Sequence, residues 1–547
     1  MDGYFEKSPS ESRDAQTQRV GASQGLAMAR LVAAGIFLSR IAGLLRESVF
    51  AHYFGNSDSA DAFKAAFRIP NILQNLFGEG VLSASFIPVY SRLLAQHKER
   101  EASELAYAVG LLLGLAMTAL AIAGVFAAPY LVDALAPGFQ GAKRSLAIAL
   151  ARIFFPGAGL LALSAWCLGV LNSHNRFFAS YAAPVAWNSA IILAMVFYGT
   201  SRSESSLARI VAWGALIGSA LQFGVQLPQA LTLLGSVKIS LSRARRSLAS
   251  VFGNFVPVVV GRGVVQLSSY VDNVLASLLP GGAVAALNYA QIINMLPVSL
   301  FGMSVAAAEL PAMARAAAPS STAAETIAVR LNFGLRQISF LVTPSAAAFL
   351  FLGDVIVGAL FQSGRFGRAD ALYVWVVLAG SAIGLLAVTM GRLYSSAYYA
   401  LWDTRTPLKF AVLRVLLTAL LGYVCALLLP PFLGIDRRWG VVGLTATAGI
   451  AGWIEFILLR ATLNRRIGTT GVESGFLIKL WALACVAALA ALMVKTWVAP
   501  SEPHLRALVV LPVYGAVYLG AARWLKIPEL TQVIDALRIG RHVRPEA

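Results

Sequence analysis

The sequence predicts an all-α polytopic membrane protein with about 14 transmembrane helices. Of its 547 residues, 58% are hydrophobic and only 13% are charged, and the mean hydropathy is +0.71. These values are typical of proteins embedded in a bilayer. Apolar runs of about 20 residues recur from Leu26 to Leu525, and each is long enough to cross a hydrocarbon core of about 30 Å as a helix. Barrel strands would instead be about 10 residues long, with alternating polarity.

The apolar runs divide the chain into successive predicted helices. These lie near residues 29–54, 60–94, 103–128, 145–172, 180–199, 208–234, 248–278, 284–314, 328–352, 370–398, 408–430, 440–462, 476–498 and 506–525. Residues 1–25 are polar and lack the apolar core and cleavage site of a signal peptide, so we expect the first helix to direct insertion. An even number of crossings places both termini on one side.

The distribution of Lys and Arg predicts that this side is the cytoplasm. The segments SVKISLSRARRS and LNRRIG fall on the side of the termini, whereas FGNSDSAD and LLPGGAVAA on the other side carry no Lys or Arg. The whole chain gives about 23 basic residues inside and about 10 outside, as the positive-inside rule requires. The formal charge of +18 therefore reflects topology, and no nucleic-acid partner is expected. Residues 236–252 are basic and amphipathic, and either lie along the inner membrane surface or form an ordinary positive-inside loop.

Signatures of catalysis and of metal binding are weak. Cys167, Cys425 and Cys485 all lie in apolar runs, which indicates buried, inert thiols. The five histidines form no metal-spaced pair. GEG at 78–80 and PGG at 280–282 lack the strand and helix context of a phosphate-binding loop. The chain is therefore expected not to be an enzyme, and any transport would use an ion gradient, the membrane potential or the substrate gradient.

A weak internal repeat predicts two lobes. Residues 70–92 and 297–315 both read Pro, Phe-Gly, small residues, Pro and Arg, and they would fall in the second and eighth helices. Chance similarity between helices rich in small residues is the alternative. The predicted organisation is a polar cytoplasmic segment at 1–25, an N-lobe at 26–235, a C-lobe at 236–465, helices 13 and 14 at 466–526 and a cytoplasmic tail at 527–547.

Charged residues inside the predicted helices indicate a polar interior. A charge at the bilayer centre costs about 2.5 to 3.5 kcal/mol, so charges that persist there usually face a cavity or a partner. On the first helix, Glu47 falls about 20° from Arg40 and Arg46 falls about 120° from it, with Gly43 between the arginines. The planar guanidinium group of arginine matches the geometry of phosphate oxygens. The broad charged side of this helix therefore favours an anionic, phosphorylated substrate.

Further intramembrane charges lie on the second and seventh predicted helices. The second carries Asp61, Lys64, Arg68 and Glu79, and the seventh carries Arg262 and Asp272. The structural alternative is that Arg40 pairs with Glu47, and Arg68 with Asp61 or Glu79, only to hold helices together.

Residues 39–92, which begin SRIAGLLRESVFAHYFG, closely resemble the first two helices of the MurJ (MviN) family of lipid II flippases. LNSHNRFFASYAAPVAWN, LFQSGRFGRADA and YYALWDTRTPLK continue the resemblance over nearly the whole chain. The resemblance implies the multidrug/oligosaccharidyl-lipid/polysaccharide (MOP) exporter superfamily. Its fold has two six-helix lobes in a V shape, and in this family helices 13 and 14 add an apolar groove for an undecaprenyl tail.

The resemblance also implies a substrate site. It matches Arg40 and Arg46 to cavity arginines, Asp61 and Glu79 to acidic positions, and Arg68 to a basic one. The predicted substrate-binding residues are Ser39, Arg40, Arg46, Glu47, Asp61, Arg68, Gln74, Glu79 and Arg262. Two positions depart from the family pattern, because Gln74 and Ile292 stand where relatives have arginines. We hypothesise that Arg262 restores part of the lost positive charge.

Some family members bind sodium through an aspartate that matches Asp272. The partner positions here are Thr418 and Gly422, and Gly422 offers no side-chain oxygen. Asp272 is therefore either a sodium ligand or the ion-pair partner of Arg262. No other cofactor is expected, and dependence on the membrane potential is the alternative to sodium.

The expected function is that of a lipid II flippase in the bacterial plasma (inner) membrane. It would move undecaprenyl-pyrophosphate-linked peptidoglycan precursor from the inner to the outer leaflet by alternating access. Expected partners are lipid II and the phospholipid bilayer, with cell-wall synthesis proteins as further candidates.

Three alternative functions stay open. The first is a MOP exporter of another lipid-linked oligosaccharide or of a drug. An enzyme with a lipid-phosphate donor is disfavoured by the short external loops, and a non-transporting scaffold would leave the intramembrane charges without a role.

Overall fold

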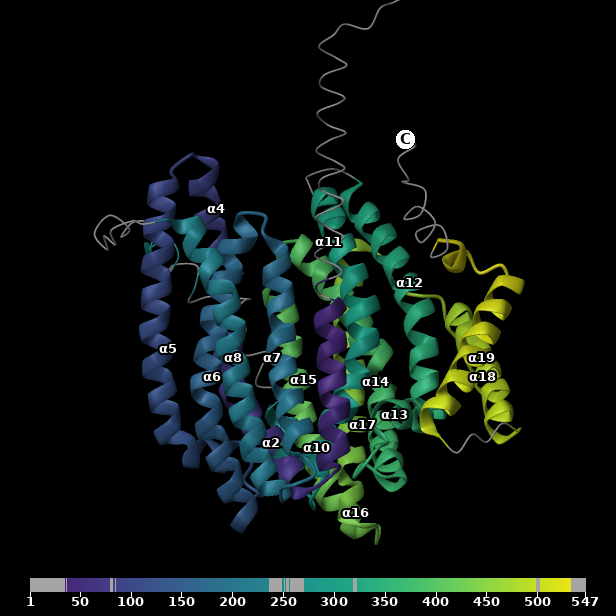
Figure 1. Cartoon of the computed structure of the whole chain (residues 1–547). Coiled ribbons are helices and arrows are strands. Elements are labelled where there is room, and N and C mark those ends of the chain that lie inside the picture. The colour runs from purple at the N-terminus through teal and green to yellow at the C-terminus, as the bar shows by residue number, and fades with distance from the viewer. Residues whose placement is uncertain are drawn as a thin grey trace, which may run out of the picture. The chain divides into compact units, whose positions relative to one another are not determined.

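The computed structural model describes residues 35, 37–78, 82–83, 85–235, 248–249, 251, 255, 270–317, 322–497 and 502–532. The regular structure in these residues is helical throughout, which confirms the predicted all-α class (Figure 1). The helices of the first half are α2 (Asp58–Phe77), α4 (Ile87–Ala95), α5 (Glu99–Leu135), α6 (Gly141–Ser173), α7 (Phe177–Tyr198) and α8 (Glu204–Leu234). Those of the second half are α10 (Ala283–Pro297), α11 (Met303–Ala316), α12 (Ala323–Phe351), α13 (Gly353–Phe361), α14 (Arg368–Ala400), α15 (Arg405–Tyr423), α16 (Leu429–Phe432), α17 (Gly440–Ile467), α18 (Ser474–Trp497) and α19 (Pro503–Trp524).

Eleven stretches of the described chain are long and apolar enough to span a membrane. They correspond to eleven of the predicted helices; the prediction 145–172, for example, is observed as α6. The predicted total of 14 is not confirmed. Two of the other three predicted spans lie partly or mostly outside the described residues. The third contains α2, whose Asp58, Asp61, Lys64 and Arg68 make it too polar to qualify by composition.

The described residues form two compact units. Unit 1 takes those within Met1–Phe50, Ala66–Val132 and Ser145–Gly263, and unit 2 takes those within Ala51–Ala65, Asp133–Arg144 and Val264–Ala547. Two short segments from the first half of the sequence therefore belong to the second unit. The boundaries predicted for the lobes stay predictions.

In unit 1, polar side chains satisfy carbonyl groups that prolines leave without a donor. Pro184 lies inside α7 and has no N–H, so the carbonyl of Ser180 lacks its intrahelical partner. Gln226 of α8 donates to that carbonyl at 3.3 Å. Trp187 of α7 also reaches α8 and donates to the carbonyl of Ala215 at 3.2 Å, although no proline lies four residues after Ala215. Such bonds matter in a membrane, where no water is present to replace them.

In unit 2, a side chain also donates to a carbonyl that a proline leaves without a donor, and this bond helps to attach the last two helices. Pro344 inside α12 leaves the carbonyl of Phe340 without an N–H donor, and Tyr518 of α19 donates to that carbonyl at 2.9 Å. Tyr514 donates to the carbonyl of Pro344 itself at 2.7 Å. Beyond α19, Glu529 is buried and forms an ion pair of 2.6 Å with Arg336 of α12. The α18 and α19 pair, drawn in yellow, is therefore fastened along α12 (Figure 1).

The predicted repeat is described in part. In the first copy, α2 ends at Phe77, directly before Gly78. In the second copy, α10 passes into a π-helical turn at Val298–Gly302, which ends on the matching Phe-Gly pair. Residues 79–81, which follow in the first copy, lie outside the described residues, so the repeat stays a prediction.

Candidate functional site

A polar cavity of about 780 Å³ lies within unit 1. It is lined by Ser39, Arg46, Phe67, Asn71, Gln74, Asn75, Ser83, Leu161, Ser164, Ala165, Leu168, Ser180, Pro184, Trp187, Asn188 and Gln222. Among these described lining residues, Arg46 is the one with a full charge, and five others are amides. A space of this size and composition suits a large polar ligand that carries negative charge.

Arg46 is held in place on two sides. Its guanidinium donates to Glu47 Oε1 at 2.6 Å and lies 4.8 Å from the centre of the Trp187 ring. The side chain keeps 19% of its surface exposed, whereas Glu47 is buried. Because a guanidinium has five N–H donors, the contact with Glu47 leaves capacity to bind an anion in the cavity. Glu47 thus orients Arg46, its neighbour in sequence.

The amides and hydroxyls of the cavity form a connected network on α6, α7 and α8. Gln222 donates to Ser164 at 3.0 Å, and Ser164 donates to Gln226 at 2.7 Å. Asn188 donates to the carbonyl of Pro184 at 2.9 Å, while its Oδ1 is buried without a hydrogen-bond partner. Such groups can donate hydrogen bonds to neutral polar ligands such as sugars and peptides, and they can accept hydrogen bonds from them. The sequence analysis did not single out these residues; isolated amides inside apolar helices were the signal that could have found them.

The structure brings only part of the predicted substrate set to this cavity. Ser39, Arg46 and Gln74 line it, and Glu47 contacts Arg46. Arg40 is exposed and Arg68 is half-buried in the same unit, but neither is among the lining residues. Glu79 and Arg262 lie outside the described residues, so the hypothesis about Arg262 stays a prediction.

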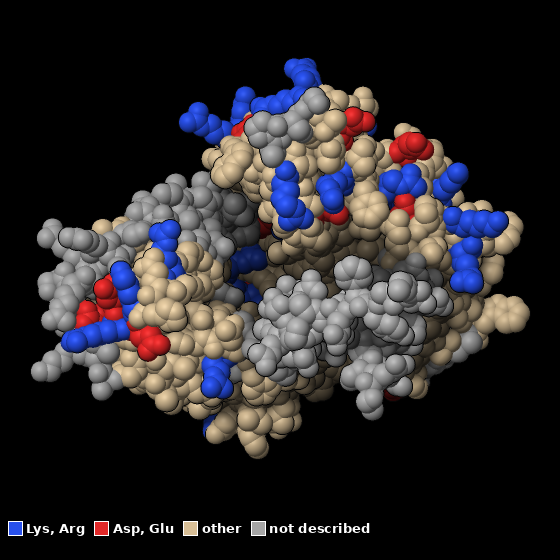
Figure 2. Space-filling view, turned by 90° about the horizontal axis from the view of Figure 1, so that it is seen from above, with Lys and Arg blue, Asp and Glu red and all other residues tan. Residues whose placement is uncertain are grey.

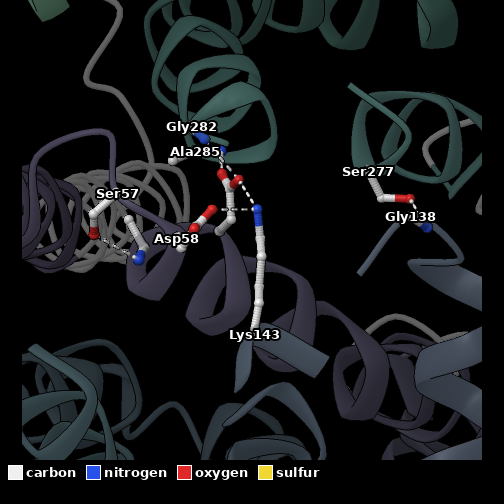
Figure 3. A network of polar contacts seen from close by, with 9 residues as sticks. Ser57, Asp58, Gly138, Lys143, Ser277, Gly282 and Ala285 are labelled. Atoms are coloured by element: carbon white, nitrogen blue, oxygen red, sulfur yellow. Dashed lines mark hydrogen bonds and ion pairs between the residues drawn. The ribbon is translucent and has the colours of Figure 1, made fainter. Parts of the chain in front are cut away.

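Asp61 belongs to a separate network in unit 2. Its carboxylate accepts hydrogen bonds from Lys143 Nζ at 2.6 Å and from the backbone N–H groups of Gly282 and Ala285 at 2.8 and 2.7 Å. The last two belong to the start of α10, where the helix dipole favours a negative charge. Lys143 also donates to Asp58 at 2.9 Å, and Figure 3 shows its side chain extending toward Asp58 and the α10 terminus. With 1% of its surface exposed, Asp61 serves as an anchor between two helix starts.

The PGG motif at 280–282 allows this close approach. A Cβ on Gly281 would lie 2.5 Å from Asp58 Oδ1, and one on Gly282 would lie 2.6 Å from the carbonyl of Asn56. Gly282 also has a φ of +88°, which side chains rarely tolerate. The two glycines therefore let α10 begin directly against the segment that precedes α2.

Asp272 lines a smaller pocket of about 140 Å³ in unit 2. The other polar lining residues are Gln291, Asn294, Ser381 and Thr445. Asn294 Oδ1 is buried without a hydrogen-bond partner. The expected partner positions do not line this pocket: Thr418 is 3% exposed, and a Cβ on Gly422 would meet the side chains of Leu444 and Leu275. Within the described residues, no three His, Cys, Asp or Glu side chains gather around a point that could hold a metal.

Comparison with known proteins places this chain in a family. The profile described as "Lipid II flippase MurJ" matches residues 50–509, which is most of the chain. The chain belongs to the lipid II flippase MurJ family. It is 32% identical over 435 residues to the lipid II flippase MurJ of Burkholderia cenocepacia, which covers 78% of this chain and 82% of that protein. It is 31% identical over 459 residues to the probable lipid II flippase MurJ of Rhizobium meliloti, with 83% of each covered.

Solved structures support the same fold. A lipid II flippase MurJ in an inward closed conformation matches with a TM-score of 0.72 and 24% identity, over 90% of this chain and 99% of that one. A multidrug resistance MATE transporter of the MOP superfamily, in an inward-facing conformation, matches with a TM-score of 0.62 and 16% identity, over 78% of this chain and 95% of that one. This chain therefore shares its fold with these two transporters, in agreement with the all-α membrane fold predicted from the sequence.

This MurJ family member also carries an intramembrane charge cluster that the sequence analysis missed. Arg414 of α15 donates to Glu455 of α17 at 2.9 Å. Arg392 lies on α14, four residues beyond Val388 of the Asp272 pocket and therefore on a similar helix face. The signal was available, since each residue interrupts an apolar run in the same way as Arg40 and Arg46.

The YYALWDTRTPLK segment of this MurJ chain builds a loop before α15. Asp403 accepts hydrogen bonds from the backbone N–H groups of Arg405 and Thr406 at 3.1 and 3.0 Å, and from the Thr406 hydroxyl. Arg466 donates to the same carboxylate at 2.7 Å. The backbone bond from Thr406, supported by the hydroxyl and by Arg466, lowers the pKa of Asp403 to about 2. The motif therefore stabilises a loop outside the membrane-spanning segments.

Proposed function

We propose that this protein is a lipid II flippase, which moves undecaprenyl-pyrophosphate-linked peptidoglycan precursor from the inner to the outer leaflet of the bacterial plasma membrane. The observation that carries the proposal is the cavity of about 780 Å³ in unit 1, where Arg46 stands among amides and hydroxyls. Membership of the MurJ family supports the choice of lipid II over other lipid-linked cargo.

The cavity divides the recognition of such a substrate between two kinds of group. Arg46, oriented by Glu47 and Trp187, would bind the pyrophosphate through charge-assisted hydrogen bonds. The amides of Asn71, Gln74, Asn75, Asn188 and Gln222 would bind the sugars and the peptide. Gln74 contributes a neutral donor at a position that the resemblance matches to an arginine, so Arg46 would supply a larger share of the positive charge.

Asp61 would govern one step of alternating access. It ties the start of α2 to the start of α10 through Lys143 and two backbone N–H groups. Any state that separates these helix starts must break those three contacts or exchange them for water. We infer that the network stabilises one conformational state of unit 2 relative to another.

We further propose that both termini are cytoplasmic and that the membrane is the inner membrane. Exposed basic residues at one end of the helices support this orientation; in unit 1 they include Lys98, Arg100 and Arg176. Figure 2 views the molecule from that end, and Lys and Arg side chains are more frequent there than Asp and Glu. Cytoplasmic ends of membrane proteins carry such an excess.

Sodium is the one cofactor that we propose, with Asp272 as its charged ligand. The carboxylate of Asp272 and the unpartnered Asn294 Oδ1 line the same pocket, together with the hydroxyls of Ser381 and Thr445. Oxygen donors of this kind suit a hard cation. The membrane potential is the alternative source of energy.

Cell-wall synthesis proteins stay candidate partners. Helices α18 and α19 would hold the lipid tail along their exposed apolar surface, which includes Met493 and Leu508.

The proposal is tested by depleting the protein in its host and measuring whether lipid II becomes inaccessible to an externally added cleaving enzyme. We expect accessible lipid II to fall as the protein is lost, and to return when the gene is expressed again. Unchanged accessibility in a strain without another flippase would overturn the proposal. Accumulation of a different lipid-linked oligosaccharide under the same depletion would instead support the alternative exporter.

A further inference from the structure

An apolar groove of about 430 Å³ runs between α5 and α6 on unit 1. Its lining consists of Gly114, Met117, Thr118, Ala121, Ile122, Val125, Phe126, Pro156, Gly159, Leu160 and Leu163. Every one of these residues comes from α5 or α6, so no other described helix covers the groove. Glycines at positions 114 and 159 leave the space that larger side chains would fill, and the groove is wide enough to accept a hydrocarbon chain.

The groove lies on the far side of α6 from the polar cavity. On this helix, Leu161, Ser164, Ala165 and Leu168 line the cavity, whereas Pro156, Gly159, Leu160 and Leu163 line the groove. At 100° per residue the two sets point about 140° apart. The groove therefore opens away from the cavity, on a side where Ile122 and Phe126 of α5 are exposed. In a membrane protein, an exposed apolar surface of this kind faces lipid.

One basic side chain stands at the end of the groove. Arg152 lies one turn before Pro156, toward the start of α6, and within about 30° of the mean direction of the groove residues. It is exposed, and no acidic side chain among the described residues pairs with it. Its Nε donates to the carbonyl of Val125 at 3.3 Å. That carbonyl lacks an intrahelical donor because Pro129 follows four residues later.

The bond to Val125 fixes the guanidinium beside the groove without neutralising it. Four further N–H donors of Arg152 stay available beyond the one that Val125 accepts. Phe126 and Tyr130, which continue along α5 toward the same end, are 76% and 78% exposed. Tyrosine collects at the level of lipid headgroups, and a nearby arginine can extend to that level. An apolar groove that ends at a positive charge matches an amphiphile with a phosphate above an acyl chain.

We propose that this groove is a binding site for an anionic glycerophospholipid of the surrounding bilayer, with its phosphate on Arg152 and one acyl chain between α5 and α6. The lipid belongs to the leaflet on the side of the α5–α6 connection, which is the outer leaflet in the orientation proposed above. The site is distinct from the substrate cavity and does not depend on which substrate the protein moves. Its occupant would strengthen the packing of α5 on α6.

The test uses the full-length protein in nanodiscs of phosphatidylcholine that contain a small fraction of phosphatidylglycerol with a photoactivatable diazirine in one acyl chain. After illumination, peptide mapping should find label on residues 114–126 and 156–163. Arg152→Gln should lower that labelling by about fivefold, the effect of one basic residue at an anionic surface. The matched control is Arg209→Gln, which removes an exposed arginine of α8 and should leave labelling unchanged.

A second variant fills the groove while it keeps the charge. A Cβ on Gly159 would lie 3.7 Å from Met117 Cβ, an ordinary contact, so the first carbon of the leucine in Gly159→Leu fits the local packing. It should also reduce labelling, with Arg152 intact. Thermal unfolding of each variant establishes that it is folded. Equal labelling of the wild type and of Arg152→Gln would overturn the proposal. The proposal would also be overturned if undecaprenyl phosphate displaced the probe and unlabelled phosphatidylglycerol did not. The latter result would assign the groove to a prenyl chain.

Discussion

The cavity of unit 1 and the pocket of unit 2 each include residues from one copy of the predicted internal repeat, yet they differ in size and charge. The first is about 780 Å³ and contains Arg46, whereas the second is about 140 Å³ and contains Asp272. Both also include amides. The comparison teaches that the two sites carry opposite charges. We therefore expect the first unit to recognise an anion, whereas the pocket of the second unit contains a carboxylate.

The largest expected effect concerns Arg46. Arg46→Ala removes the charged donor of the cavity, and charge-assisted hydrogen bonds are worth about 1.5 to 3 kcal/mol each. Two bonds to a pyrophosphate would then correspond to a loss of roughly a hundredfold or more in flipping rate. We expect no growth when this variant replaces the wild-type protein. Lipid II accessibility in the same cells provides the direct measurement.

Two control variants separate anion binding from folding at this position. Arg46→Lys keeps the charge above Trp187 but loses the fork geometry, so it should retain partial activity. Arg209→Ala removes an exposed arginine on α8 and should grow normally. Normal growth of Arg46→Ala at ordinary membrane levels would contradict the assignment of anion recognition to unit 1.

The helices were largely predictable from the sequence because a bilayer imposes a simple requirement. Each apolar run of about 20 residues must become a helix, so α6 and α17 begin within a few residues of their predicted starts. The site was predictable where charge interrupts such a run, as at Arg46. The partners of Asp61 were not, since Lys143 lies 82 residues away and Gly282 lies 221 residues away. Local patterns contain no information about such pairings.

The amides of the cavity other than Gln74 were missed for a related reason. Asn188 and Gln222 lie in runs that are otherwise apolar, and an isolated amide in such a run is consistent with a helix contact, a lipid-facing position or a cavity. Only the packing of the folded helices shows which of these three positions the amide occupies. Asn188 is buried with an unpartnered Oδ1 and lines the cavity, which distinguishes it from an amide that merely joins two helices.

An intermediate effect is expected at Asp61. Asp61→Asn keeps the shape but removes the charge that faces Lys143 and the start of α10, so we expect unfolding to become easier by about 2 kcal/mol. Thermal unfolding of the purified protein measures this. Lys143 retains Asp58 as a partner, which limits the loss. Adding Lys143→Met should recover part of the stability, because the double variant no longer contains an unbalanced buried charge. If the two substitutions were simply additive, the proposed coupling between Asp61 and Lys143 would be wrong.

The smallest effect is expected at Asp272, and it tests the role of unit 2. Asp272→Asn keeps an oxygen in the pocket beside Asn294 but removes the negative charge, so a cation would bind less tightly. We expect flipping to fall by only about threefold to tenfold, since one coordinating charge among several oxygen donors is lost. The response to external sodium should disappear in this variant while recognition of the anionic substrate is unchanged. Flipping is measured in proteoliposomes with sodium or with choline as the matched cation. If the wild-type protein flips equally fast in sodium and in choline, Asp272 is better explained as an ion-pair partner. If Asp272→Asn lowers the flipping rate as much as Arg46→Ala does, the two units share anion recognition.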